Sequence, residues 1–357
     1  RDIIFIVIVA GLLILGGIII WRQVSSVPSI STVTEKTAGS ASADDRAIIN
    51  DQGLTDGVTS TMEKMSDRDI LITDGIKHSI PLERVVSGGP PKDGIPAIRS
   101  PKFESVEQAS TYLRDDGLGI GIHSGEVERF YPFQILVWHE IVNDMVGGVP
   151  VAITYCPLCG TAIVYEGLVN GEAEDFGVSG KLYDSNLLMY DRSTDSYWSQ
   201  ALGEAVVGEL TGTKLNLYQN FENITWGEWK QAHPDGEVLS RDTGYVRDYT
   251  REPYGNYGQT PELFFPVSND DTRLPRKEPI VGLVIDGVAK AYQMSLFDEV
   301  SEIEDVVNGQ DVLLIKQEGE GVRGHLIDDK GEKIKIGLNY SFWFSWAATH
   351  PATTIYK

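Results

Sequence analysis

Short apolar runs separated by turn residues fill most of the chain after residue 66, and this pattern predicts a body made mainly of β-strands. One run, Val149–Tyr155, predicts a buried strand that leads directly into Cys156 and Cys159, the two cysteines of the chain. Just before this strand, four positions at helical spacing predict a short helix: Ile135, Leu136, His139 and Val142. The sequence therefore places a C-x-x-C pair at the end of a strand, with a histidine close by along the chain.

A further group of short strands follows the cysteine pair. The segment 178–208 contains three β-prone runs separated by polar turns: Val178–Tyr183, Leu187–Asp191 and Tyr197–Gln200. These runs predict an antiparallel meander beside the cysteines. The segment 241–257 is instead dense in Tyr and Arg, and two interpretations are open for it: the wall of a pocket, or an exposed loop fixed by stacked rings.

The body also contains an internal repeat, because residues 120–153 align without a gap with residues 281–314. The matched pairs include Gly121 with Gly282, Arg129 with Lys290, Tyr131 with Tyr292, and Asp144 with Asp305. A second pair of motifs ends each copy: Trp229-x-x-x-His233-Pro234 and Trp346-x-x-x-His350-Pro351. We therefore expect two related β-rich halves with short helices, 118–240 and 279–357. The two repeated histidines and His123 are expected to have structural roles.

The two copies differ where the candidate chemistry lies. His139 of the first copy aligns with Val300 of the second, and the two cysteines align with Gln317 and Glu320. Residues needed only for folding should be tolerated equally in both copies. Their restriction to one copy favours a functional site that is built on the first half.

The N-terminal segment has a different pattern from the body. Ile3–Ile20 is an unbroken apolar run that ends at Trp21 and Arg22, so residues 1–22 are predicted to form a transmembrane helix. Residues 23–66 are rich in Ser, Thr, Ala and Asp and predict a stalk, which leaves 67–357 as the body. We expect a single anchor in the cell membrane and an extracellular or periplasmic body. A pilin-like helix in a filament core is the alternative.

Charge and composition exclude one class of partner and agree with an external location. The formal net charge is −22, which is opposite in sign to the basic surface that binds nucleic acid. Two cysteines are too few for a disulfide scaffold. Asn223 and Asn339 begin N-x-[ST] motifs and are candidate glycosylation sites on an external body.

The cysteine pair and the histidine together predict a metal site. Thiolate and imidazole ligands suit copper or zinc, and the C-P-L-C-G segment resembles the metal-binding knuckle of rubredoxin-like sites. A tetrahedral site needs two ligands beyond Cys156 and Cys159, and His139 is the candidate third. Met189 or Asp191, from the predicted meander, is the candidate fourth. Methionine would favour copper, whereas a carboxylate or water would favour zinc.

Two other interpretations of the cysteines remain open. The first is thiol–disulfide exchange, because C-x-x-C is the redox spacing, although β-prone residues rather than a helix follow Cys159. The second is a Cys156–Cys159 disulfide in a structural surface protein, a homo-oligomer or a pilus-like filament subunit. Whether the protein is an enzyme is left undecided, since enzymatic activity at a metal would need an open coordination position.

Several separate motifs resemble one known family. In order along the chain they are GGPPKDGIPAI, YPFQILVWHEIVND, TYCPLCGTAIVY, FGVSGKLYDSNLLMYDRSTDSYWSQ and FWFSWAATHPATTIY. From about residue 75 to the C-terminus the chain looks like the DUF3179 family of bacterial and archaeal proteins, whose function is unknown. The family's histidine and cysteine positions fall on His139, Cys156 and Cys159. One departure is Gln293, which stands after Tyr292 where the family usually has proline.

Overall fold

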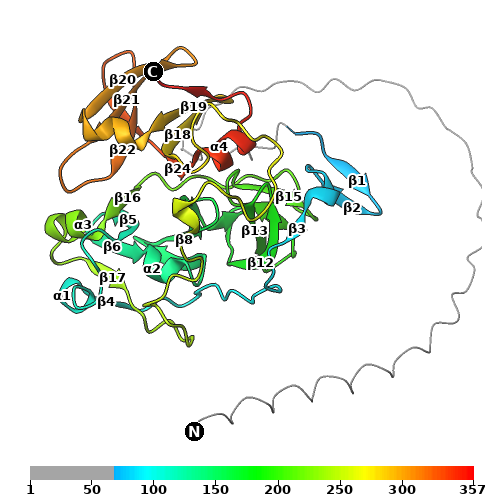
Figure 1. The fold of residues 1–357 in the computed structure, drawn as a ribbon, viewed down its shortest axis with the longest axis horizontal. Coiled ribbons are helices and arrows are strands. Elements are labelled where there is room, and N and C mark those ends of the chain that lie inside the picture. Colours follow the sequence, from blue (N-terminus) through cyan, green and yellow to red (C-terminus); the bar gives the residue numbers. More distant parts are fainter. Residues whose placement is uncertain (1–67) are drawn as a thin grey trace, which may run out of the picture. The chain divides into compact units, whose positions relative to one another are not determined.

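The computed structural model describes residues 68–357, and these form a body made mainly of β-strands, as predicted. The expected anchor helix and stalk, residues 1–22 and 23–66, lie outside the described residues. Within the described part, no helix has both the length and the apolar character needed to cross a membrane. The helices there are short (Figure 1), and the strands gather into several sheets.

A five-stranded sheet contains four strands of the first half of the body and β4, which precedes that half in the chain. Across the sheet its strands are β16 (Phe221–Thr225), β5 (Leu118–Ser124), β6 (Val127–Pro132), β17 (Glu237–Leu239) and β4 (Phe103–Ser105). Strands β5 and β6 form an antiparallel hairpin, and β17 runs parallel to β6. Helix α3 (Trp226–Ala232) follows β16 and is N-capped by the Thr225 side chain.

A seven-stranded sheet joins the two halves of the body. Across the sheet its strands are β25 (Thr354–Ile355), β19 (Val288–Gln293), β18 (Pro279–Ile285), β24 (Asn339–Phe342), β9 (Thr161–Glu166), β8 (Val149–Cys156) and β7 (Ile141–Val146). The first four belong to the second half and the last three to the first half. The junction is the pairing of β24 with β9, where Tyr340 faces Ala162. Helix α4 (Trp343–Thr349) follows β24.

The two aligned segments fold with the same order of elements. Strands β16, β5, β6 and β17 with helix α3 correspond to β24, β18, β19 and β25 with helix α4, and the pairing directions match. The side-chain contacts correspond as well. The Tyr131 hydroxyl donates to Asp144 at 2.5 Å, and the Tyr292 hydroxyl donates to Asp305 at 2.6 Å. The aligned residues thus lie on strands that pair in the same order and direction.

The remaining strands form three further sheets. The predicted meander is present in a second seven-stranded sheet, whose strands in order are β1 (Leu71–Thr73), β2 (Ile76–His78), β15 (Glu204–Val207), β14 (Tyr197–Ser199), β13 (Asn186–Asp191), β12 (Phe176–Tyr183) and β3 (Val86–Ser87). A four-stranded sheet contains β20 (Glu302–Val307), β21 (Gln310–Lys316), β22 (Val322–Ile327) and β23 (Lys333–Ile336). A small sheet pairs β10 (Leu168–Val169) with β11 (Glu172–Ala173).

The other helical segments are all short: α1 (Val106–Ala109), α2 (Phe133–Leu136), η1 (Leu82–Arg84), η2 (Tyr257–Gln259) and η3 (Met294–Asp298). The structure corrects the helix expected through His139. Helix α2 ends at Leu136, and Val142 lies in β7, where it faces Ile153 of β8. Glu140 separates the two elements with a left-handed φ of +59°. Pairing with the buried strand β8 therefore overrides the local helical spacing.

Candidate functional site

The two cysteines lie on a tight turn between β8 and β9. Cys156 ends β8 and faces Thr161 of β9 across the hairpin. The backbone N–H of Cys159 donates to the carbonyl oxygen of Cys156 at 3.1 Å, and Gly160 has a left-handed φ of +59°. A glycine in this conformation directly after the second cysteine lets the turn close without steric cost. The turn thus brings both sulfurs to one side of the hairpin end.

Both sulfurs are unpaired and buried in the core of the body. The Cys159 thiol donates to the carbonyl oxygen of Ser185, at the β12–β13 turn, over 3.0 Å. Burial, followed by the hydrogen bond to Cys159, raises the pKa of Cys156 well above its usual range. The Cys156 side chain is consequently a neutral thiol at pH 7 when no cation is near it.

The charge of the Glu140 carboxyl group is one of the influences that raise the pKa of Cys156, after burial and Cys159. The backbone carbonyl of Glu140 accepts a hydrogen bond from the N–H of Tyr155 at 2.8 Å, next to Cys156 in the chain. The side chain is buried, and burial raises the pKa of Glu140 to about 8. The left-handed backbone costs a non-glycine residue roughly 1–2 kcal/mol, a strain that clusters at functional sites.

The long segment 240–278, between β17 and β18, contributes two tyrosines to this site. The hydroxyl of Tyr254 donates to Glu140 Oε1 at 3.4 Å. Tyr257 is buried, its hydroxyl has no hydrogen-bond partner in the described part, and both thiols act on its pKa, which is raised mainly by burial. Lys277 holds the segment in place, because its Nζ lies 3.2 Å from the centre of the Tyr257 ring.

His139 is close along the chain, but both of its ring nitrogens bind other partners. Nδ1 lies 2.7 Å from the carbonyl oxygen of Pro96, and Nε2 lies 2.7 Å from the hydroxyl of Tyr249. A carbonyl only accepts, so Nδ1 donates and Nε2 accepts from Tyr249. Burial lowers the pKa of His139 to about 4, which keeps the ring neutral. In this structure His139 links the segment 240–278 to the chain around Pro96.

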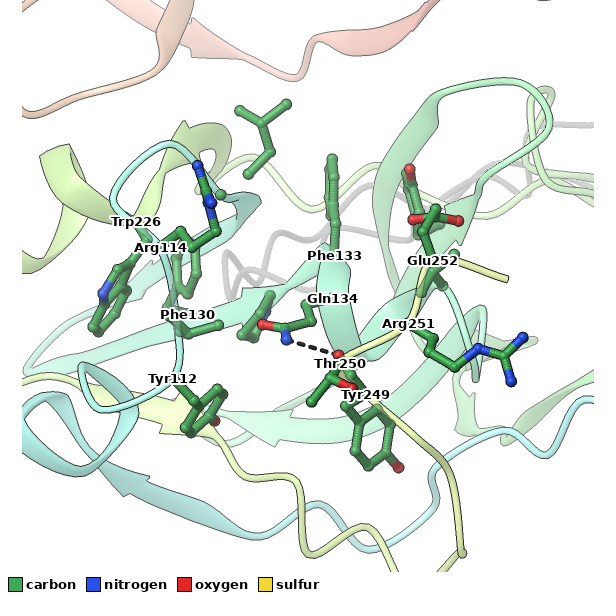
Figure 2. A pocket seen from close by; sticks show the side chains of 16 residues that line it. Tyr112, Arg114, Phe130, Phe133, Gln134, Trp226, Tyr249, Thr250, Arg251 and Glu252 are labelled. Carbon is green, nitrogen blue, oxygen red and sulfur yellow. Dashed lines mark hydrogen bonds between the residues drawn. The ribbon is translucent and has the colours of Figure 1, made fainter. Parts of the chain in front are cut away.

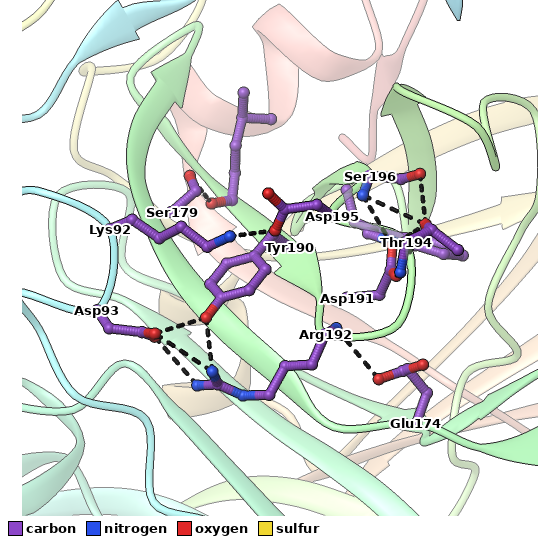
Figure 3. A network of polar contacts seen from close by, with 12 residues as sticks. Lys92, Asp93, Glu174, Ser179, Tyr190, Asp191, Arg192, Thr194, Asp195 and Ser196 are labelled. Atoms are coloured by element: carbon purple, nitrogen blue, oxygen red, sulfur yellow. Dashed lines mark hydrogen bonds and ion pairs between the residues drawn. The ribbon is translucent and has the colours of Figure 1, made fainter.

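The two candidates for a fourth ligand have structural neighbours of their own. Met189, on β13, is fully buried and faces Val178 of β12 on one side and Trp198 of β14 on the other. The carboxylate of Asp191 accepts from the backbone N–H of Thr194 at 2.6 Å and of Ser196 at 3.1 Å, as Figure 3 shows. Asp191 thereby closes the turn between β13 and β14.

The site lies inside the part of the chain that matches a family model. The model is described as "Protein of unknown function (DUF3179)", and it matches residues 92–353, most of the chain. This chain belongs to the DUF3179 family. No curated protein and no solved structure matches it.

The DUF3179 match contains the cysteine turn, Glu140, His139 and the whole segment 240–278. It also contains both candidate glycosylation sites. Asn223 lies on β16 and Asn339 on β24; both side chains are half-buried, and both Oδ1 atoms are buried without a partner in the described part. These asparagines thus sit within sheets, whereas glycan acceptors usually lie on exposed loops.

A pocket of about 300 Å³ is lined in part by Tyr155, the residue before Cys156. Figure 2 shows its largely aromatic wall, which includes Phe130, Phe133, Trp226 and Tyr249. The rings of Phe133 and Tyr155 stack with their centres 4.1 Å apart. The indole N–H of Trp226 is buried without a hydrogen-bond partner in the described part. Tyr155 and Tyr249 therefore connect this pocket to the surroundings of the cysteines and of His139.

Sequence reasoning missed Glu140 and the two tyrosines as neighbours of the thiols. The density of Tyr and Arg over 241–257 was the available signal for the tyrosines, and both interpretations of that segment hold in part. Tyr249 is buried at the pocket beside His139 and Tyr257 is buried near the cysteines, whereas Val246 is almost fully exposed. For Glu140 the sequence held no signal beyond its place next to His139.

Proposed function

We propose that this DUF3179 protein binds a zinc ion through Cys156, Cys159 and Glu140, in a body held outside the cell by an N-terminal membrane anchor. The proposal is supported by two free thiols on a glycine-closed knuckle and by a buried carboxyl group whose charge acts on Cys156. In the described part the ligand atoms of these three residues do not all lie within 4.8 Å of one another, so binding would draw them together around the ion. Thiolate and carboxylate ligands both occur at zinc sites. The anchor rests on the apolar run Ile3–Ile20.

Charge favours zinc over Cu⁺ for this set of ligands. Two thiolates and one carboxylate carry three negative charges when they bind metal. Zn²⁺ leaves one of these charges uncompensated and Cu⁺ leaves two, and uncompensated charge is costly in a buried site. A neighbouring cation also explains how buried thiols become ligands, because it favours the deprotonated form of groups such as Cys156.

Glu140 is a better third ligand than His139 for a reason that the hydrogen bonds supply. His139 would have to release Tyr249 from Nε2 before it could bind an ion. Glu140 has a single hydrogen bond to its side chain, at the long distance of 3.4 Å from Tyr254. Tyr254 or a water molecule then supplies the remaining oxygen ligand.

The test is the metal content of natively purified protein, measured by mass spectrometry together with a free-thiol count. We expect near-stoichiometric zinc that is lost in Cys156→Ser and strongly reduced in Glu140→Gln. Met189→Leu is the matched control, because it changes the copper ligand candidate while keeping the volume of a buried side chain. Loss of metal in Met189→Leu, or stoichiometric copper, would contradict the choice of Glu140 and zinc.

One observation favours thiol–disulfide exchange as a second candidate. The ionised form of Glu140, which with a pKa of about 8 is the minor form at pH 7 and the major form above pH 8, can accept the Cys156 thiol proton. The thiolate then attacks a disulfide of a partner protein and releases one of its sulfurs as a thiolate. Full burial of both cysteines opposes this reading. Metal-free protein with two thiols that react reversibly with a disulfide reagent would place this candidate first. Metal-free protein with a Cys156–Cys159 disulfide would instead support the structural role.

A further inference from the structure

A second group of metal-binding side chains meets at one end of the five-stranded sheet, away from the cysteines in sequence. It consists of His123 on β5, Glu222 on β16, and His233 at the C-terminal cap of α3. One ligand atom from each of the three lies within 4.8 Å of the others. His123 Nε2 lies 3.0 Å from Glu222 Oε1. Two imidazoles and a carboxylate are a ligand set found at zinc and other first-row metal sites.

Neighbouring groups orient these three side chains. The Glu128 carboxylate accepts a hydrogen bond from Nδ1 of His123 and lies 3.4 Å from Nδ1 of His233. A carboxylate on Nδ1 makes the Nε2 nitrogen of a histidine a stronger ligand, and at His123 an ion would replace the proton that Nε2 shares with Oε1 of Glu222, itself a ligand of the group. Glu128 thus has the position of the outer carboxylate in a carboxylate–histidine–metal arrangement.

Glu222 is fixed from the opposite side. Its Oε2 accepts from the backbone N–H of Gly321 at 3.0 Å and from Nε of Arg323 at 3.1 Å. These contacts come from the start of β22, in the second half of the body. They hold one carboxylate oxygen and leave Oε1 directed at His123. The guanidinium of Arg323 also stabilises the negative charge of Glu222, whose side chain is 1% exposed.

The second half of the body shows what the fold requires at these positions. The pair His123–Glu128 across β5 and β6 corresponds to Val284–Ala289 across β18 and β19. Glu222 faces Gly121, and its equivalent, Asn339, faces Gly282. The second half therefore builds the same strands and helix without three of these four polar side chains.

Only the fourth residue is common to both halves. His233 and His350 each cap a helix and lie against the preceding tryptophan, with ring centres 5.2 and 4.2 Å apart. The histidine at the cap is thus part of the scaffold, and the first half adds ligand groups around it. Because the equivalent strands and helix of the second half form without counterparts of His123, Glu128 and Glu222, the convergence of these side chains on His233 points to a separate role.

The group can also be reached from solvent. The side chains of His123 and His233 are 17% and 18% exposed, whereas that of Glu222 is 1% exposed. An ion can therefore arrive without opening the core, and water can complete its coordination. This access distinguishes the group from the fully buried cysteines.

We propose that His123, Glu222 and His233 form a second metal site, which binds a divalent first-row transition ion with Glu128 as the outer carboxylate. The ion joins β5, β16 and α3, and through Glu222 it also fixes the start of β22. The site is independent of the one proposed at Cys156 and Cys159, and either can exist without the other.

The test exchanges first-half residues for their second-half equivalents. The triple variant His123→Val, Glu128→Ala, Glu222→Asn keeps side chains that the same strands already accept in the second half. Zinc binding is measured by equilibrium dialysis on full-length chains that also carry Cys156→Ser and Cys159→Ser. We expect one zinc ion per chain that carries only the two cysteine substitutions (the thiol-free chain), and none when the triple variant is added to them. Glu128→Ala alone should weaken binding by about 10–100-fold.

The controls keep the two metal sites distinguishable. His350→Gln changes the equivalent histidine of the second half and should leave zinc binding unchanged. Should the thiol-free chain fail to fold, Co²⁺ is titrated into the unaltered chain and into the triple variant. Thiolate ligands give Co²⁺ a strong near-ultraviolet charge-transfer band, whereas histidine and carboxylate ligands do not. In the triple variant, therefore, only the Co²⁺ binding that lacks this band should disappear. Equal metal binding by the triple variant and its parent would overturn the proposal and leave an ion-pair network.

Discussion

Removing the hydroxyl of Tyr249 tests the hydrogen-bonded chain that ties the segment 240–278 to His139. That hydroxyl donates to Nε2 of His139 at 2.7 Å and accepts from Thr243 at 2.6 Å. In Tyr249→Phe the ring stays and both partners lose their bond; His139 is fully buried and Thr243 is 8% exposed. Each bond contributes about 0.5–1.5 kcal/mol, and a buried polar group left without a partner costs about 1–3 kcal/mol. We expect the free energy of unfolding to fall by about 2 kcal/mol.

The assay is urea unfolding of chelator-treated protein at pH 7, followed by tryptophan fluorescence. Tyr245→Phe is the matched control, because the Tyr245 ring lies 5.6 Å from the His139 ring but is 44% exposed. Its effect should stay within about 0.5 kcal/mol, as for surface substitutions in general. Equal unfolding free energies for the two variants would refute the placement of His139 in this chain of bonds.

The same variant also tests the choice of the third zinc ligand. Tyr249→Phe frees Nε2 of His139 without touching Glu140. If Glu140 is the ligand, zinc affinity should not rise. A clear gain in affinity would show that His139 competes with Tyr249 for the ion, as the sequence suggested, and that the role proposed for Glu140 is wrong.

Three further predictions concern acid stability, strand packing and the anchor. The pKa of His139 in the folded protein is about 4, below its usual 6.5, so neutral His139 contributes about 3 kcal/mol to the free energy of unfolding above pH 6.5, and this contribution is lost as the pH falls towards 4. Urea midpoints measured from pH 7 to pH 4 should therefore fall less steeply in His139→Gln than in the unaltered chain. Gly282→Ala should destabilise the body by about 1–3 kcal/mol in urea unfolding, because its Cβ would lie 2.5 Å from the Trp346 ring, whereas the Cβ of the control Gly258→Ala would meet Phe342 at an ordinary 3.8 Å. Deleting residues 1–22 should move the protein from the membrane fraction to the soluble fraction on centrifugation, and a truncated chain that still sediments with membranes would contradict the predicted anchor.

The sequence alone determined the features that depend on local chemistry and on strand period. Alternating and apolar runs located the meander of β12 to β14, and the C-P-L-C-G segment marked the knuckle that holds the two cysteines. The gapless alignment also identified equivalent elements, because matching strands, turns and tryptophans must keep the same spacing to keep the same register. Each of these signals is read from a short stretch of sequence and specifies the element that the same stretch forms.

Only the tertiary structure decided which side chains meet. The segment through His139 has helical spacing, but pairing of Val142 with β8 made it a strand, and Glu140 took the strained backbone between the two elements. The burial of Glu140, which raises its pKa, and its contact with Tyr254 of the segment 240–278 both depend on long-range packing.

The group of His123, Glu222 and His233 shows the same limit of sequence reasoning. Its members are separated by up to 110 positions along the chain, the distance from His123 to His233. The sequence presented His123 and His233 as structural residues and gave Glu222 no particular role. Contacts over such separations depend on how whole sheets pack, and no local pattern encodes that packing. Here the fold brings two histidines and a carboxylate to one sheet end, and their chemistry follows from that meeting.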